Sequence, residues 1–154
     1  MPAWEEKGMK ISETIPVMRF LGKRFGFYST IPKQAWVIDS EVDFVYAEWF
    51  NTMKICFGGK SNNTPENVEK WCAIIEKIAS RYSEKFAKTS TKFIAADRLT
   101  LPDFWIAVLV WTHWRNEGYN MGADMCAHAD AVLCKPEHKK FKEYIERLHV
   151  ALKP

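Results

Sequence analysis

Apolar residues recur at three- and four-residue steps along most of this chain, the spacing that places them on one face of an α-helix. The longest such run covers residues 32–56, where the charged residues fall largely on other faces. Its apolar positions are Ile38, Val42, Val45, Trp49 and Met53. The pattern predicts a long amphipathic helix that is closed by the Gly58-Gly59 pair.

A second long helix is predicted from Thr64 to about Ala87. Thr64 is a favourable N-cap, Pro65 suits the first helical position and Glu66 places an acid in the first turn. The apolar residues that follow keep helical spacing, and they are Val68, Trp71, Cys72, Ile75, Ile78, Ala79 and Tyr82.

The segment Phe104–Trp111 is apolar on nearly every side, and a helix of that kind belongs at the centre of a fold. Two shorter helices are predicted after it, at about Ala123–Cys134 and Glu137–Leu152. We therefore expect five helices after residue 32, packed as a bundle around Phe104–Trp111. The residues expected to touch this central segment are Val42, Val45, Trp71, Ile75 and Leu148.

The first 26 residues follow a different pattern. Residues 3–6 and 9–11 are predicted to be two short strands of a hairpin that turns at Lys7-Gly8. A helix then begins at Ser12 or Glu13 and ends at Gly26. Residues 27–33 are interpreted as a linker to the longer helices.

Composition favours one compact domain over two. The chain has 154 residues, of which 47% are hydrophobic and 14% aromatic, so it can bury a core. Its formal charge of +3 comes from 22 basic and 19 acidic residues that alternate along the chain. This distribution is typical of a solvated surface, and we expect no nucleic-acid partner.

The chain also carries few signals of location. Its most apolar stretch has about eight residues, against the roughly 20 that a bilayer requires, so no membrane span is expected. The first residues resemble neither a secretion signal nor an organelle presequence. The spacing of the cysteines favours free thiols in a reducing compartment, the cytoplasm or alternatively the mitochondrial matrix. The four cysteines are Cys56, Cys72, Cys126 and Cys134.

Two local patterns carry candidate chemistry. Thr100 followed by Asp103 is typical of a capping box at the start of a helix, with Leu99 and Phe104 placed to form a hydrophobic staple around it. The cysteines and histidines near the C-terminus deviate from common zinc spacings, and one helical stripe explains them, so ordinary packing is favoured over a metal site. These residues are Cys126, His128, Cys134 and His138. His113, between two tryptophans, is interpreted as a packed histidine.

The segment Phe93–Phe104 reads Phe-Ile-Ala-Ala-Asp-Arg-Leu-Thr-Leu-Pro-Asp-Phe. It resembles the segment before the central helix of the glutathione transferase C-terminal domain, in which an aromatic-aliphatic pair, a glycine-aspartate turn, Leu-Thr and Ala-Asp-Phe follow in order. Ala96 stands in place of the glycine, and Pro102 in place of the alanine.

A second segment, Lys10–Leu21, resembles the strand-turn-helix of the same family, in which an acidic or amide residue and a serine precede a helix that ends in Arg-Tyr-Leu. Glu13 and Thr14 take the first pair of positions here, and Arg19-Phe20-Leu21 the last three. The resemblance covers nearly the whole chain and is to the sigma-like glutathione transferases.

The resemblance implies a mostly all-α fold: a glutathione transferase C-terminal helical bundle preceded by a β-hairpin and a helix from a thioredoxin-like domain. The implied divisions are a remnant of that glutathione-binding domain at 1–26, a linker at 27–33 and the helical domain at 34–154.

The resemblance also implies a partial glutathione site at Met1, Pro2, Glu13 and Thr14. In the family, the Glu-Ser pair at the helix start binds the γ-glutamyl carboxylate, and a cis-proline loop at the position of Pro2 pairs with the cysteinyl backbone. A helix N-terminus suits such a carboxylate because its N–H groups are open and its dipole is positive there. A plain cap by residues 12–14 remains the alternative from the residues alone.

Met1 replaces the residue before that proline, so the resemblance implies a chain that begins within the thioredoxin-like domain. The segment expected to be missing holds the Tyr, Ser or Cys that lowers the glutathione thiol pKa from about 8.5. In the family, an acidic residue on the first long helix reaches the glutathione of the partner subunit, and its position falls near Ala47 here. The adjacent Glu48 points about 100° away from that position around the helix axis. No catalytic residue and no metal ligand is therefore assigned.

Three functions remain open. The first is a catalytically silent accessory or scaffold subunit of a larger assembly, which requires no cofactor but retains glutathione as a candidate ligand. The second is a glutathione transferase that conjugates glutathione to electrophiles and whose first residues are missing. The third is a carrier of a hydrophobic ligand. For the first, we expect other protein subunits to cover residues 1–25, with a homodimer as the alternative, because an open two-stranded hairpin is marginal in water.

Overall fold

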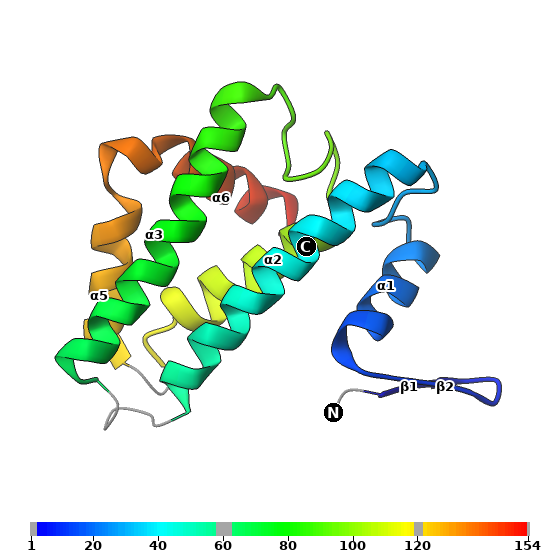
Figure 1. Ribbon diagram of the computed structural model, residues 1–154, viewed down its shortest axis with the longest axis horizontal. Coiled ribbons are helices and arrows are strands. Elements are labelled where there is room, and N and C mark those ends of the chain that lie inside the picture. The colour runs from blue at the N-terminus through cyan, green and yellow to red at the C-terminus, as the bar shows by residue number, and fades with distance from the viewer. Residues whose placement is uncertain (1–2, 58–62, 119–121, 154) are drawn as a thin grey trace.

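The computed structural model describes residues 3–57, 63–118 and 122–153 as a hairpin followed by helices (Figure 1). Strands β1 (Ala3–Glu6) and β2 (Met9–Ser12) pair antiparallel. The turn between them has positive φ at both central residues, 47° at Lys7 and 81° at Gly8, as tight hairpin turns require. This confirms the predicted hairpin and its turn.

Helix α1 (Thr14–Arg24) follows the hairpin. Gly26 has a φ of 78°, and the Phe27 N–H donates to the Gly22 carbonyl at 2.8 Å. A left-handed residue followed by this bond is the Schellman arrangement that terminates helices, and glycine adopts it without a Cβ penalty. The sequence prediction that Gly26 ends the helix is therefore confirmed.

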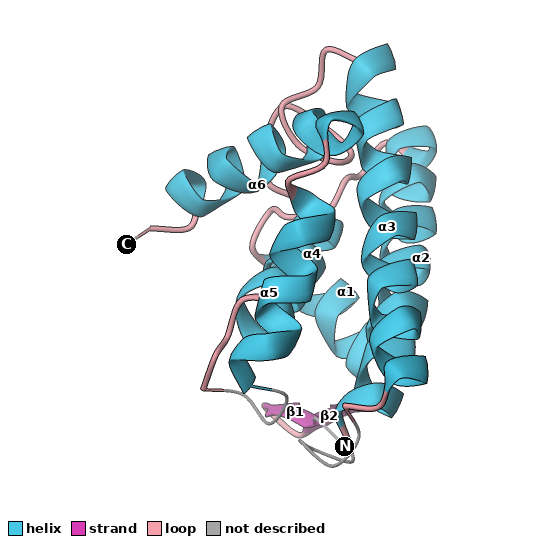
Figure 2. Cartoon of the chain, turned by 90° about the vertical axis from the view of Figure 1, so that its left-hand side faces the viewer, coloured by secondary structure: helices cyan, strands magenta, loops and turns pink. Residues whose placement is uncertain are grey.

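Five α-helices follow, as the sequence predicts. The two longest, α2 and α3, lie side by side and run in opposite directions (Figures 1 and 2). Their bounds are α2 (Pro32–Cys56), α3 (Pro65–Lys88), α4 (Leu101–Val108), α5 (Gly122–Leu133) and α6 (Lys139–Ala151). Two short helical pieces join them, the π-helical η2 (Leu109–Trp114) and the 3-10 turn η3 (Pro136–His138). Within the described ranges, none of the helices combines the length and apolarity needed to cross a bilayer.

The core of the bundle forms around α4 and η2. Trp105, Ile106, Leu109 and Val110 are buried there. They belong to one apolar cluster that includes the residues predicted to surround them, namely Val42, Val45, Trp71, Ile75 and Leu148.

The expectation that all of Phe104–Trp111 is buried is wrong for one face of the helix. Phe104, Ala107 and Trp111 are only half-buried, and Val108 is 37% exposed. These four residues are spaced by three and four, so they form one stripe. An all-round apolar sequence therefore marks a helix with a buried face and a second, partly open apolar face. The change from α- to π-helix at Leu109 was also not predicted, because both share the same local pattern.

Helix α1 approaches α4 closely at Gly22. Gly22 is buried, and a Cβ placed on it would lie 2.6 Å from the Leu101 Cδ2. Since Leu101 is itself 2% exposed, its side chain has little room to move aside. Glycine is thus required here by the distance between two helices rather than by backbone conformation.

We predict that Gly22→Ala lowers the free energy of unfolding by about 1–3 kcal/mol, because the added methyl overpacks the contact with Leu101. Urea denaturation followed by circular dichroism measures the change. In a Leu101→Ala background the methyl has space, so the same substitution is expected to be neutral or to stabilise by up to about 1 kcal/mol through helix propensity. Equal costs in both backgrounds would show that the close approach does not matter.

Candidate functional site

The turn between β2 and α1 is the part of the chain with the most unusual backbone. Glu13 has a φ of 74° and a ψ of 136°, and it stands at the N-cap position of α1. Its exposed side chain makes no capping hydrogen bond, and its carbonyl accepts the Val17 N–H at 3.1 Å. The first N–H groups of α1 are therefore not capped by this carboxylate, contrary to the plain-cap alternative for Glu13.

Positive φ at a residue with a side chain costs roughly 1–3 kcal/mol, and such strain gathers at ligand-binding turns. Thr14, the first residue of α1, is half-buried beside this turn. The strained turn, the helix N-terminus and the threonine hydroxyl together suit a carboxylate ligand. Met1 and Pro2, the other residues expected at this site, lie outside the described residues.

A polar network ties α1 to α2 behind the turn. Arg19 donates to Asp39 at 2.6 Å and to Asp43 at 3.0 Å, and the Tyr28 hydroxyl donates to the other oxygen of Asp39 at 2.5 Å. Burial and then the hydrogen bond to Asp39 raise the pKa of Tyr28 to about 12. This network fixes the direction of α1, and no spacing in the sequence indicated it.

A second polar network surrounds Asp103, which is 0% exposed. Thr100 and Asp103 form the capping box, in which the Thr100 N–H and hydroxyl both donate to Oδ2 at 2.8 Å. Oδ1 accepts from the Ile94 N–H at 3.0 Å and from the Tyr144 hydroxyl at 2.8 Å. Burial raises the pKa of Asp103, although all four donors favour its ionised form.

The two staple residues, Leu99 and Phe104, flank this box and are half-buried, and Leu99 packs against the core. The Phe104 ring packs edge-on against Phe27 with centroids 4.8 Å apart. The capping box and its two flanking residues therefore lie at the start of α4, on the side of the bundle that faces α1. Sequence analysis missed Tyr144 because it is 41 residues away along the chain.

Several buried thiols and phenols of the described bundle have raised pKa values. Burial raises the pKa of the Cys56 thiol to about 11, and it also raises the pKa values of Cys72 and Cys126. The pKa values of the buried Tyr82 and Tyr144 hydroxyls are raised as well, first by burial. A thiolate or phenolate at neutral pH requires shifts in the opposite direction.

His113 lies in η2 and is buried against α2. Its Nε2 accepts the Trp49 indole N–H at 3.1 Å, and burial lowers its pKa, so the neutral ring is favoured. Its interpretation as a packed histidine agrees with this geometry. In the described ranges, no three metal-binding side chains come together, and those near the C-terminus do not form a cluster.

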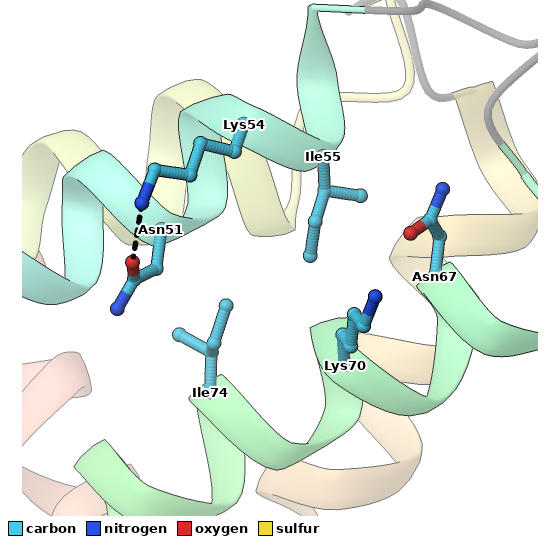
Figure 3. A pocket seen from close by; sticks show the side chains of 6 residues that line it. All are labelled: Asn51, Lys54, Ile55, Asn67, Lys70 and Ile74. Carbon is cyan, nitrogen blue, oxygen red and sulfur yellow. Dashed lines mark hydrogen bonds between the residues drawn. The ribbon is translucent and has the colours of Figure 1, made fainter.

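A groove of 440 Å³ runs between the second half of α2 and the first half of α3 (Figure 3). Ile55 and Ile74 point into it from the two helices, and amide and ammonium groups surround them. Both ammonium groups have neighbours, Lys54 with Asn51 at 3.4 Å and Lys70 with Glu66 at 2.6 Å. The groove is amphipathic, and its charges are already partly matched.

A smaller cavity of 190 Å³ lies between α1 and α4. Its walls are almost entirely apolar, and they include the face of α1 that is turned toward α4 and the half-buried Phe104 of α4. The lining residues are Met18, Leu21, Gly22, Phe25, Phe27, Leu101 and Phe104. This site offers an apolar ligand or an apolar side chain a place to pack, but no polar group to orient it.

No protein-family model and no curated protein matches the chain. Solved structures do match, and the glutathione S-transferase Blo t 8 is similar over 100% of this chain and 73% of its own, with 17% identity and a TM-score of 0.59. The monomeric glutathione S-transferase Na-GST-3 of the hookworm Necator americanus is 22% identical over 93% of this chain and 73% of its own, with a TM-score of 0.61.

The Nu-class glutathione S-transferase of Haemonchus contortus is 18% identical over 93% of this chain and 72% of its own, with a TM-score of 0.57. At this level of identity the similarity shows the fold alone. The chain therefore has a glutathione S-transferase-like fold, with a short β-hairpin and then helices, as the sequence resemblance implied.

We predict that Glu13→Gly raises the free energy of unfolding by about 1 kcal/mol, since glycine adopts this backbone conformation without strain. Glu13→Ala is the matched control: it removes the same carboxylate but keeps the strain, so it should not stabilise. Thermal or urea denaturation of both variants measures the difference. A stabilisation of equal size in both would assign the cost to the carboxylate and not to the backbone.

Proposed function

We propose that this chain is a catalytically silent, glutathione transferase-like accessory or scaffold subunit of a larger assembly, in which another polypeptide covers residues 1–25. The observation that carries the proposal is the apolar surface left open on the hairpin and α1. Phe25 is 59% exposed and Met9 is 43% exposed. Ile15, Met18 and Leu21 are only half-buried, although they form the apolar face of α1.

The position of this surface supports a partner. The hairpin and α1 stand at one side of the molecule, away from α3, α5 and α6 (Figure 1). Each large apolar side chain that is fully covered contributes about 1.5–3 kcal/mol, so covering several of them is comparable to the stability of a small domain. An open two-stranded hairpin also offers backbone N–H and C=O groups for pairing.

In this proposal the partner is a different protein rather than a second copy of this chain. The polar part of the hairpin is internally matched, because Glu6 pairs with Arg24 and Glu5 with Lys10. The hairpin and α1 can therefore bind an apolar surface of a partner. In a homodimer, the exposed apolar residues of the two copies would contact each other. A homodimer is the outcome that would replace this part of the proposal.

The pKa shifts of cysteines and tyrosines in the bundle support the part of the proposal that makes the chain catalytically silent. In the part of the chain that the structure describes, every cysteine and tyrosine with a shifted pKa has it raised. None is thus prepared to supply or stabilise a thiolate. Glutathione remains a ligand of the proposed remnant site through Glu13 and Thr14, with no cofactor required.

Hydrogen exchange on the isolated, monomeric chain tests the proposed partner. We expect rapid amide exchange across residues 3–24 and slow exchange in Phe104–Trp111, because only the second segment is enclosed by the core. Adding the true partner should slow exchange in the first segment alone. Equal and strong protection of both segments in a demonstrated monomer would show that the hairpin and α1 need no cover, and the accessory role would lose its support.

The second candidate is a glutathione transferase that conjugates glutathione to electrophiles. The strained Glu13 turn favours it, because strain of this kind is typical of a working ligand site. Under this reading the sulfur-activating residue belongs to a segment before Met1. An in-frame strand followed by Tyr or Ser in the upstream coding sequence would favour the enzyme.

For the purified 154-residue chain, we predict no measurable conjugation of glutathione to a chloronitroaromatic substrate. Weak retention on immobilised glutathione that Thr14→Ala abolishes is compatible with the accessory role. Turnover that scales with protein concentration and survives Thr14→Ala would overturn the silent role without bearing on whether residues 1–25 are covered.

A further inference from the structure

A third cavity, of 260 Å³, lies where the chain leaves α3 and passes beside α6. Lys92 faces it from the loop after α3, and Lys140, Glu143 and Arg147 face it from α6. The three α6 residues are spaced by three and four, so they share one face of the helix. Three cationic groups therefore surround a single carboxylate.

Arg147 is held in place by groups that leave its outer nitrogens free. Its Nε donates to the Lys92 carbonyl at 3.3 Å, and its guanidinium carbon lies 5.7 Å from the centre of the Phe86 ring. Phe86 is buried and stacks on Tyr144 with centroids 4.8 Å apart, so this support is rigid. In the described ranges, the two terminal nitrogens of Arg147 have no hydrogen-bond partner of their own.

The one carboxylate in the cavity does not cancel the positive charge. Lys140 and Glu143 are 3.4 Å apart, and their side chains are 54% and 37% exposed, so solvent weakens this pair. Lys92 donates its backbone N–H to Asp97 at 3.0 Å, and in the described ranges its exposed ammonium group forms no ion pair. The cavity thus keeps two positive charges in excess.

The loop adds a neutral donor. The Thr89 hydroxyl donates to the Lys85 carbonyl at 3.0 Å, so in its 3.2 Å contact with Thr91 the proton must come from Thr91. Both threonine hydroxyl protons are therefore used within the loop. Ser90, which is exposed and also lines the cavity, keeps a hydroxyl that can donate to a ligand.

We propose that this cavity binds a tetrahedral oxyanion, the phosphoryl or sulfo group of a small molecule. A planar guanidinium can give two parallel hydrogen bonds to two oxygens of such a group, and the ammonium groups and the Ser90 hydroxyl serve the remaining ones. This site is formed by α6 and the loop after α3, so it is separate from the turn at Glu13 and does not rest on the proposed function.

Inorganic phosphate is the probe that tests the site. The 15N-labelled chain is titrated with phosphate at constant ionic strength, with chloride as the reference anion, and the amide of Lys92 and the Nε–H of Arg147 are followed by NMR. We expect saturable shifts at both, with a dissociation constant on the order of 1 mM. Sulfate should compete with phosphate because it has the same geometry.

Arg147→Gln should weaken phosphate binding by about tenfold, which is the loss of one charge-assisted pair. Arg147→Lys keeps the charge but not the planar guanidinium. We expect it to bind phosphate more weakly than the unchanged chain and more tightly than Arg147→Gln. Lys33→Gln removes one charge from an exposed lysine at the start of α2 and should leave binding unchanged. Shifts that never saturate, or equal losses in Arg147→Gln and Lys33→Gln with none in Arg147→Lys, would show that phosphate senses only the overall charge and would overturn the site.

Discussion

The carboxylate of Asp103 is buried where the loop before α4, the first turn of α4 and helix α6 meet. An isolated charge at such a position would be strongly unfavourable, and four donors from these three segments compensate for it. Because every donor must be in place, the loop, the start of α4 and Tyr144 of α6 are fixed together. The start of α4 in turn places Leu101 against Gly22, and so decides where α1 docks.

The bundle around this carboxylate is closed on most sides. Glu41 of α2 is buried and accepts hydrogen bonds from Tyr82 at 2.9 Å and Lys85 at 2.7 Å, which joins α2 to α3. Burial opposes the charge of Glu41, but these donors prevail and keep its pKa below the usual value. On the side that faces α1, α4 presents the half-buried Phe104, and the exposed Phe25 directly follows α1. The buried carboxylates of the bundle have hydrogen-bond partners, whereas the apolar residues on this side are partly exposed. This difference is the physical basis for proposing a partner there.

The strained turn at Glu13 and the basic cavity beside α6 belong to different parts of this arrangement. The first lies at the start of α1, in a chain whose fold is similar to that of glutathione S-transferases of known structure, and its chemistry suits a carboxylate. The second depends on side chains of α6 and the loop after α3, and its chemistry suits a more highly charged oxyanion. The two sites therefore differ both in their position in the fold and in the charge of the ligand that suits each of them.

The sequence by itself determined what depends on neighbours along the chain. Helical spacing predicted the five helices after residue 32 and their order. The glycines predicted the Lys7-Gly8 turn and the end of α1 at Gly26, and Thr100 with Asp103 predicted the capping box. The resemblance of two segments also gave the fold. All of these features are set by residues within a few positions of each other, which a pattern can record.

Only the tertiary structure decided which groups meet across long separations. Tyr144 reaches Asp103 over 41 residues, and Arg19 reaches Asp39 over 20. The basic cavity joins Lys92 to Arg147 over 55 residues, and the open stripe at Val108 is defined by what fails to cover it rather than by its own apolar sequence. Local patterns show which residues share a helix face, but the burial, partners and charge of that face depend on which other helix packs against it.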